Sequence, residues 1–255
     1  MSRSAVPAEG AWIAHLNWLQ VQERIHAGAA ALIPIGAASK EHGPHLPLHS
    51  DQLQAEWLTQ ALLQCFPLLA WPVVTYGYYP AFVDYPGSSH LQENTFKALV
   101  NDVVSGIIRH GIEHVFLLNT GISTIRPLTE CAQKNTNLVM LNAYSGPQCT
   151  AACEAVIESG DGGHADERET SILLAIEPDQ VVMERAPGND QTNIKGAGPL
   201  QWRDPQAPNY SPSGIIGDAQ RASADKGRRI LDAIVQDLSN AVEQCLMNTN
   251  NRYKR

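Results

Sequence analysis

The sequence predicts a single α/β domain, and three observations support this fold class. The chain has 255 residues, 44% of them hydrophobic, which is enough for one large buried core. Apolar runs typical of buried strands alternate with segments of helical spacing. No internal repeat or linker interrupts this alternation. We therefore expect residues 1–255 to form one domain.

The expected elements follow from the spacing of apolar residues. Four apolar runs predict strands at residues 29–35, 68–75, 115–119 and 138–141. Amphipathic spacing predicts helices at residues 11–27, 51–65, 93–110 and 222–246, a short helix around 151–157 and another that begins near 167. Residues 187–217 are rich in glycine, proline and asparagine, and we expect them to form an irregular flap or an oligomer contact.

The bulk composition excludes several classes of protein. A formal net charge of −8 and a pI near 5.5 argue against binding to nucleic acid or an anionic membrane, since both require a basic surface. No apolar run approaches the roughly 20 residues of a membrane span, and residues 1–10 lack the apolar core of a signal peptide. The five cysteines have no zinc-ribbon spacing and fit reduced thiols. We therefore expect a cytoplasmic protein.

The stretch I-P-I-G-A-A-S-K-E-H-G-P-H-L-P-L-H-S-D, at residues 33–51, carries the strongest signal. It places His42, His45 and His49 with Glu41 and Asp51 directly after a predicted strand. The carboxyl ends of strands in open α/β sheets are where ligands bind. Imidazole and carboxylate together suit Zn²⁺, Mn²⁺ or Fe²⁺, and an aspartate can bridge two ions. Two alternatives stay open: the histidines are solvated, or the aspartate only caps the next helix.

A second polar cluster lies in the stretch G-D-G-G-H-A-D-E-R-E-T-S. His164, Glu167 and Glu169 come close together at a predicted helix start, where the positive end of the helix dipole favours acids. These residues could complete a metal or catalytic site with the first stretch. The alternative is that the acids serve only the helix dipole.

Two further loops carry residues that could contact a substrate. The segment at residues 76–91 is rich in tyrosine, and with Tyr79 and Asp84 it could line a pocket for a small planar or cyclic ligand. The same loop could instead lie against another subunit. After the strand at 115–119, Ser123 and Thr124 could cap the next helix or donate hydrogen bonds to substrate.

These motifs together resemble those of the creatininase (creatinine amidohydrolase) family. The first metal motif of that family has Glu-x-His-Gly-x-His followed by Asp, and the interval of nine residues from His42 to Asp51 matches it. The stretch from His164 resembles the family's His-Ala-Gly-Glu-x-Glu-Thr-Ser. Two departures stand out. Lys40 takes the place of the usual Glu, with Glu41 beside it, and Asn119-Thr120-Gly121 lacks the His of the usual Asn-Gly-His.

The resemblance implies a fold and a reaction class. It implies a creatininase-like three-layer α/β/α domain with a mostly parallel sheet, assembled as a homohexamer. It further implies a metal-dependent amidohydrolase that uses one or two divalent ions to hydrolyse a non-peptide C–N bond, of cyclic amide or formamide type, in a small molecule. A rival expectation, favoured by the absent His, is a metal-poor relative that binds a ligand without turning it over. The sequence does not identify the substrate.

The resemblance also gives the candidate residues their expected roles. The expected metal ligands are Glu41, His42, Asp51 and Glu169, with Asp51 as the bridge if two ions bind. His164 is the expected general acid/base, and Glu167 is its orienting partner or an alternative base. His45 would either replace the absent His ligand or contact substrate. The other expected substrate contacts are Tyr79, Asp84 and Ser123.

Overall fold

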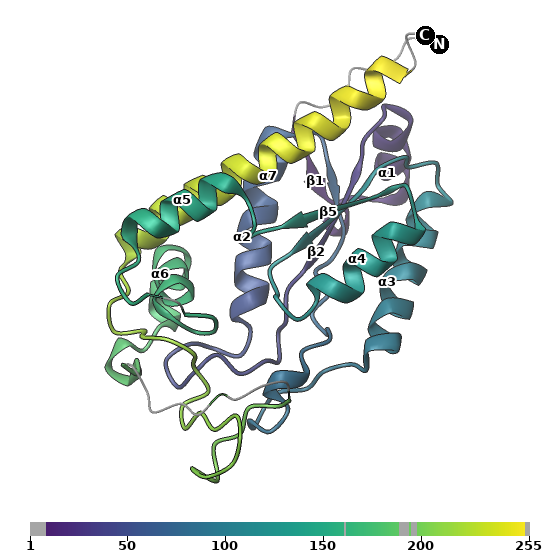
Figure 1. Cartoon of the computed structure of the whole chain (residues 1–255). Coiled ribbons are helices and arrows are strands. Elements are labelled where there is room, and N and C mark those ends of the chain that lie inside the picture. Colours follow the sequence, from purple (N-terminus) through teal and green to yellow (C-terminus); the bar gives the residue numbers. More distant parts are fainter. Residues whose placement is uncertain (1–8, 161, 189–193, 195–197, 253–255) are drawn as a thin grey trace.

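A five-stranded parallel sheet forms the centre of the protein, in a computed structural model that describes residues 9–160, 162–188, 194 and 198–252 (Figure 1). The strand order is β1-β3-β2-β4-β5, and every neighbouring pair is parallel. The strands are β1 (Ala11–Trp12), β2 (Ala31–Ile35), β3 (Leu69–Ala70), β4 (Val115–Asn119) and β5 (Leu138–Asn142). The predicted α/β class and the mostly parallel sheet are confirmed.

Helices cover both faces of this sheet. One layer contains α2 (Ser50–Cys65), α5 (Pro147–Val156), α6 (Glu167–Ile176) and α7 (Ala224–Arg252). The other contains α1 (Trp18–His26), α3 (Glu93–Ile108) and α4 (Ile125–Lys134). Short 3-10 helices are η1 (Ile13–His15), η2 (Pro80–Phe82), η3 (Pro178–Gln180) and η4 (Met183–Arg185). The arrangement has the three layers that the family resemblance implies.

Two hydrophobic cores lie between these layers, one on each face of the sheet. Leu32 and Phe116 belong to the core under α2 and α7, whereas Ile33 and Leu117 belong to the core under α3 and α4. Successive residues of a strand point to opposite faces, so a strand buried on both faces needs an unbroken apolar run. This requirement explains why the apolar runs at β2 and β4 predict strands so well.

The predicted elements differ from the structure mainly at the edge of the sheet. The helix expected at 11–27 is wrong in its first part, because Ala11–Trp12 pairs with β3 and α1 begins only after Asn17. The side chain of Asn17 caps that helix by accepting hydrogen bonds from the amides of Leu19 and Gln20. The strand expected at 68–75 is also shorter, because Pro72 has no amide hydrogen to continue the ladder.

The chain order creates a crevice between the carboxyl ends of β2 and β4. From β2 the chain crosses to β3 on one side, whereas from β4 it crosses to β5 on the other side. Ligands in open α/β proteins bind at such a reversal of strand order. Thr120, directly after β4, bridges the two segments, since its amide donates to the carbonyl of Ile35 and its hydroxyl contacts the carbonyl of Asp51. Within the described ranges, no helix is both long and apolar enough to cross a membrane.

Candidate metal centre

The site lies where the end of β2 packs against the first turn of α2. Gly36 follows β2, and a β-carbon at this position would collide with the backbone carbonyl of Asp51. Asp51 is the second residue of α2, as the sequence predicts for the start of a helix. Its carboxylate does not cap the helix, since His42 and Lys40 engage both of its oxygens. The glycine therefore lets a rigid helix start hold a carboxylate directly beside the strand end.

His42 is fully buried and both of its ring nitrogens face acceptors. Nδ1 lies 2.9 Å from the carbonyl oxygen of Lys40, and Nε2 lies 3.0 Å from Oδ1 of Asp51. Only Nδ1–H can satisfy the carbonyl, so in the neutral ring the Nε2 lone pair faces a carboxylate oxygen. Two acceptors at this distance need a proton or a cation between them. Donation from the other nitrogen to a carbonyl is the usual support of a metal-binding histidine.

His164 has the same arrangement with the nitrogens exchanged. Its Nε2 lies 2.8 Å from the carbonyl of Glu41 and 3.0 Å from Oε2 of the same residue. Its Nδ1 then faces Oε2 of Glu169 at 3.7 Å. Backbone hydrogen bonds between His164 and Ile216 fix the segment that carries the ring. The free lone pair of a second buried imidazole is therefore also directed at a carboxylate.

His42, His164 and Glu169 together could hold a metal ion. One ligand atom of each lies within 4.8 Å of those of the other two, and all three residues are buried. Ligand distances of about 2.0 to 2.2 Å give edges of roughly 3.3 Å in a tetrahedral zinc site. The edge from Nδ1 of His164 to Oε2 of Glu169 is 3.7 Å, close to that value. The residues therefore fit a divalent ion such as Zn²⁺ or Mn²⁺.

Glu169 is held in place by the first turn of α6. Asp166 caps this helix by accepting a hydrogen bond from the amide of Glu169. The carboxylate of Glu169 in turn accepts one from the amide of Ala165 at 2.5 Å. Burial raises the pKa of Glu169, but the charges of His164, His42 and Lys40 together outweigh burial and leave it below its usual value. The side chain is therefore an ionised carboxylate in a fixed position, as a metal ligand requires.

Glu41 lies beside this cluster and holds His164. One of its oxygens accepts from the amide of Gly43 and the other contacts His164. Burial raises its pKa, but the hydrogen bonds with His164 and Gly43 and the charges of His164 and His42 together outweigh burial, so the pKa falls below its usual value. A β-carbon at Gly214 would collide with this carboxylate, so the segment after residue 210 depends on glycine to close over it. Among the described residues, the three-ligand cluster does not include Glu41.

Among the described residues Asp51 is not part of the three-ligand cluster but lies beside it, with its carboxylate between His42 and Lys40. Oδ1 faces His42, and Oδ2 accepts a hydrogen bond from Nζ of Lys40 at 2.7 Å. Burial raises the pKa of Asp51, but the charges of Lys40 and His42 and the hydrogen bonds with both together outweigh burial and hold it well below its usual range. Burial lowers the pKa of Lys40, but its ion pair with Asp51 and the charges of Glu169 and Glu41 together outweigh burial, so its pKa is raised. Both groups are charged in the folded protein.

His45 is buried and has one nitrogen without a partner in the described structure. Its Nε2 lies 2.8 Å from the hydroxyl of Thr170, whereas Nδ1 has no hydrogen-bond partner. Burial is the main cause that lowers the pKa of His45 to about 4. The ring is therefore neutral near pH 7. The alternative that the loop histidines are solvated is wrong for His42 and His45, which are 0% and 1% exposed.

The structure does not bring Glu167 together with the cluster. One of its oxygens accepts hydrogen bonds from the amides of Glu158 and Ser159, and the other lies 2.5 Å from Nζ of Lys226 on α7. Its predicted role as an orienting partner or base stays a prediction, and its contacts are those of a residue that joins α6 to α7. Glu169, two residues later, faces the two histidines instead.

The three predicted substrate contacts lie in different surroundings. Tyr79 and Ser123 line a small cavity of about 20 Å³ beside Lys40 and Asp51, which is enough space for one water molecule. The hydroxyl of Tyr79 already contacts the backbone carbonyls of Ser39 and Ser89. The side chain of Asp84 is exposed and does not line this cavity.

The turn after β4 is held by Asn119 in the absence of the family histidine. Its side-chain amide donates to the carbonyl of Gly121, and its Oδ1 accepts from the hydroxyl of Thr124. Thr124 occupies the N-cap position of α4 without a side-chain capping bond, so the expectation that its side chain caps this helix is wrong. Phe82, one of the aromatic residues of the loop at 76–91, lies against the cluster, with its ring centroid 4.1 Å from that of His164.

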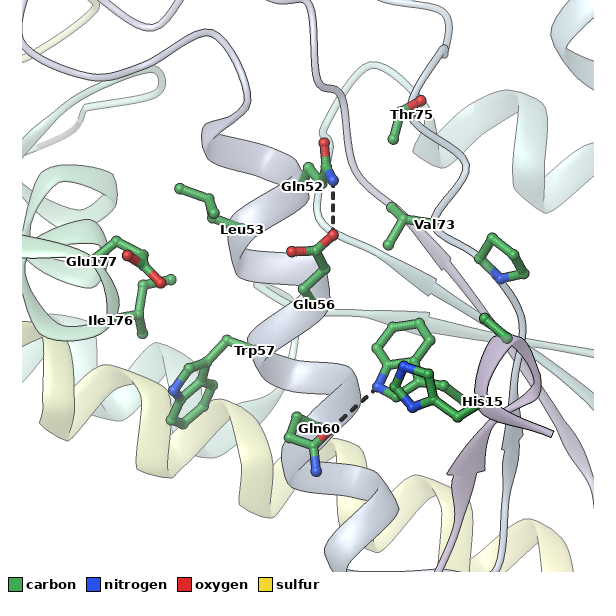
Figure 2. Close-up of a pocket in the computed structure, with 13 residues that line it drawn as sticks. His15, Gln52, Leu53, Glu56, Trp57, Gln60, Val73, Thr75, Ile176 and Glu177 are labelled. Atoms are coloured by element: carbon green, nitrogen blue, oxygen red, sulfur yellow. Dashed lines mark hydrogen bonds between the residues drawn. The ribbon is translucent and has the colours of Figure 1, made fainter. Parts of the chain in front are cut away.

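A larger hollow of about 630 Å³ lies elsewhere, between β1, α2 and the end of α6 (Figure 2). It is lined by Trp12, Glu56 and Trp57 among others, and Trp12 donates a hydrogen bond across it to Gln60. None of the metal-cluster residues lines it. We place the chemistry at the buried cluster of His42, His164 and Glu169, because the oriented ionisable groups are there. The small cavity lies beside it and is lined by Lys40 and Asp51.

Comparisons with known proteins identify the family of this chain. A family model described as creatinine amidohydrolase matches residues 14–242. Creatinine amidohydrolase of Pseudomonas putida is 25% identical over 93% of this chain and 98% of its own length. The mycofactocin precursor peptide peptidase of Mycobacterium ulcerans is 29% identical over 81% of each chain. The 3-dehydro-scyllo-inosose hydrolase of Thermotoga maritima is 25% identical over 93% of this chain and 84% of its own.

Solved structures show the same fold. A structure described as "Creatininase Mn" superposes with a TM-score of 0.81 at 22% identity, covering 92% of this chain and 98% of that one. A mutant creatininase described as "Zn-Zn type" gives a TM-score of 0.78 at 22% identity, with the same coverage. Since the family model covers most of the chain and its expected motifs meet at one site, this protein belongs to the creatininase family.

Proposed function

We propose that this protein is a metal-dependent amidohydrolase that hydrolyses a non-peptide C–N bond, of cyclic amide or formamide type, in a small molecule. The observation that carries the proposal is the pair of buried histidines, each fixed through one nitrogen and facing a carboxylate through the other. Such pairs of facing acceptors are stable around a cation. Creatininase-family relatives that act as hydrolases support the reaction class.

In this proposal His42, His164 and Glu169 hold a divalent ion of Zn, Mn or Fe. The ion would supply Lewis acidity, which makes hydroxide available near neutral pH and neutralises charge on a carbonyl oxygen. Glu41 would hold His164 through the hydrogen bond at its Nε2. The prediction that His164 instead moves a proton to the leaving nitrogen stays open to test, because its Nδ1 faces Glu169 in this structure.

The neutral ring of His45 is our candidate for contact with the substrate. Its unpaired Nδ1 is buried and can accept a hydrogen bond from an amide N–H, provided that Nε2–H donates to Thr170. The low pKa keeps this acceptor available above about pH 4. Tyr79 and Ser123 would shape the cavity beside Asp51. The residues of the site are almost fully buried, which limits the access of bulk solvent to it.

The experiment that tests the proposal is a substrate screen of protein loaded with Zn²⁺, Mn²⁺ or Fe²⁺. Cyclic amides, formamides and short peptides are offered, and release of ammonia, formate or amine is measured. Peptides are included because one relative is named as a peptide peptidase. We expect turnover of at least one small amide and its loss, by a factor of about a thousand or more, in His42→Ala.

The matched control for this screen is His15→Ala. His15 is exposed and lies outside the metal cluster, so this variant should keep the native rate. Turnover that is equal in His42→Ala and the native protein would contradict the proposed centre. Turnover of peptides alone would contradict the proposed bond while leaving the metal centre in place.

A second candidate is a metal-poor protein that binds a ligand without turnover. The ion pair between Lys40 and Asp51 favours it, because this ammonium already neutralises one of the buried carboxylates. Failure to retain any divalent ion after purification without chelator, and failure to regain one on reconstitution, would support this candidate over the hydrolase.

We also propose that the protein assembles as a homo-oligomer, a hexamer by the resemblance to the family, and that it is cytoplasmic. Light scattering coupled to gel filtration tests the first statement, and fractionation of the source cells tests the second. A monomer in the first experiment would contradict the assembly.

A further inference from the structure

One buried cation is already built into the centre. Lys40 is 6% exposed, and its ammonium lies 2.7 Å from Oδ2 of Asp51. It also lies 5.3 Å from the centroid of the Phe82 ring. A buried lysine is rare unless it is paired, because desolvation of the ammonium is costly. The lysine therefore contributes directly to the electrostatics of this site.

The ion pair with Lys40 prevents Asp51 from bridging two metal ions. A carboxylate that bridges two ions gives one oxygen to each. Here Oδ1 faces His42, and Oδ2 is engaged by the ammonium. A second divalent ion on Oδ2 would have to displace Lys40 from a buried ion pair. A second ion in the place of the ammonium would also put two positive charges next to the buried Lys40 side chain.

The charges near the cluster also balance with a single ion. Three buried carboxylates surround the two histidines, those of Glu41, Asp51 and Glu169, and Lys40 offsets one of them. Asp166 and Arg168 add one charge of each sign. The surplus of two negative charges equals the charge of one divalent ion. A second ion would leave a surplus of positive charge in a buried site.

We propose that Lys40 takes the place of a second metal ion, so that the centre binds one divalent ion per chain, next to a fixed ammonium. This inference rests on the proposed metal centre. It also gives Lys40 a role in binding, because Lys40 lines the small cavity together with Tyr79 and Ser123. There the ammonium would bind a carbonyl or carboxylate oxygen of the substrate. The similar protein described as "Zn-Zn type" provides the contrasting case.

The test uses Mn²⁺ as the probe and two readouts besides activity. Apoprotein is titrated with Mn²⁺ by calorimetry, and the loaded protein is studied by electron paramagnetic resonance. We expect one ion per native chain and the six-line spectrum of an isolated Mn²⁺ ion. In Lys40→Glu we expect two ions per chain and the exchange-coupled spectrum of a pair. Lys40→Gln should bind the first ion about tenfold more tightly, because a repelling charge is removed.

Lys97→Gln is the matched control. Lys97 is a surface lysine in ion pairs with Glu93 and Glu130, and its loss should leave both readouts unchanged. Two ions per native chain, or one ion in both native protein and Lys40→Glu with unchanged affinity in Lys40→Gln, would overturn the inference. No ion in any of the proteins would instead overturn the proposed metal centre. If circular dichroism shows that Lys40→Glu does not fold, the inference is tested by the number of ions bound per native chain and by the Mn²⁺ affinity of Lys40→Gln.

Discussion

Glu167 of α6 and Lys226 of α7 form a nearly buried ion pair, with the ammonium 2.5 Å from Oε1 of the carboxylate. Glu167 is 0% exposed and also accepts hydrogen bonds from two backbone amides before α6. Burial raises its pKa, but the hydrogen bond from Lys226 and those from the amides outweigh burial, so the pKa is below its usual value. The pair therefore ties the helix that carries Glu169 to the longest helix of the fold.

The first prediction concerns the effect of pH on this pair. Because the folded pKa of Glu167 is depressed, its stabilisation is present above the unfolded pKa of about 4.3 and is lost as the pH falls through the folded pKa. We expect Glu167→Gln to lower the free energy of unfolding by roughly 2 kcal/mol at pH 7. Urea unfolding at several pH values measures this. The difference from native protein should shrink below about pH 4, and a constant difference would contradict the assignment.

Most of the fold could be predicted from the sequence, for a physical reason visible in β4. Val115–Asn119 has the predicted bounds because a strand buried on both faces must be apolar throughout. At the sheet edge the same reasoning failed, since β1 has two residues and its pairing with β3 depends on a distant segment. Local spacing does not contain that information.

The sequence predicted which residues form the candidate site better than it predicted how their side chains are oriented. His42 and Glu169 were expected to meet, and the structure brings them together. Glu167 and Glu169 are two residues apart on one helix, which turns their side chains about 200° apart, so only one of them can face the cluster. The sequence does not say which. The inward position of Lys40 was equally hidden, because lysine is usually solvated.

A second prediction concerns His45 and acid stability. Its folded pKa of about 4 lies below the unfolded value near 6.5, so between these values the unfolded chain binds a proton that the folded chain does not. Stability should therefore fall as the pH drops through this window, by on the order of 3 kcal/mol from this residue. His45→Gln should flatten the curve of unfolding free energy against pH, measured in chelator. An unchanged slope would show that this ring is not the cause.

A third prediction concerns the close approach at Gly36. Gly36→Ala should destabilise the protein by roughly 2 kcal/mol or more, because the added methyl group pushes the carbonyl of Asp51 away from β2. Gly106→Ala is the matched control, since Gly106 lies on the exposed face of α3 and a β-carbon there would meet no atom within 4 Å. That change should stabilise the helix by about 1 kcal/mol. Chemical denaturation of both variants measures the contrast, and equal effects would contradict the packing proposed here.

The last prediction separates the two glutamates of α6 by the effect of metal on stability. A divalent ion that binds only the folded chain stabilises it by about 2.7 kcal/mol at a hundredfold excess over Kd. For a chain of this size that raises Tm by roughly 5 to 10 °C. Glu169→Gln removes one of the three proposed ligands and should abolish most of this rise. Glu167 faces Lys226 instead. The Glu167→Gln variant should therefore have a lower Tm than the native protein in chelator, but its Tm should still rise on addition of Zn²⁺ or Mn²⁺. The measurement is a thermal melt with and without ion. If Glu167→Gln lost the rise and Glu169→Gln kept it, the ion would have to lie on the α7 side of the helix.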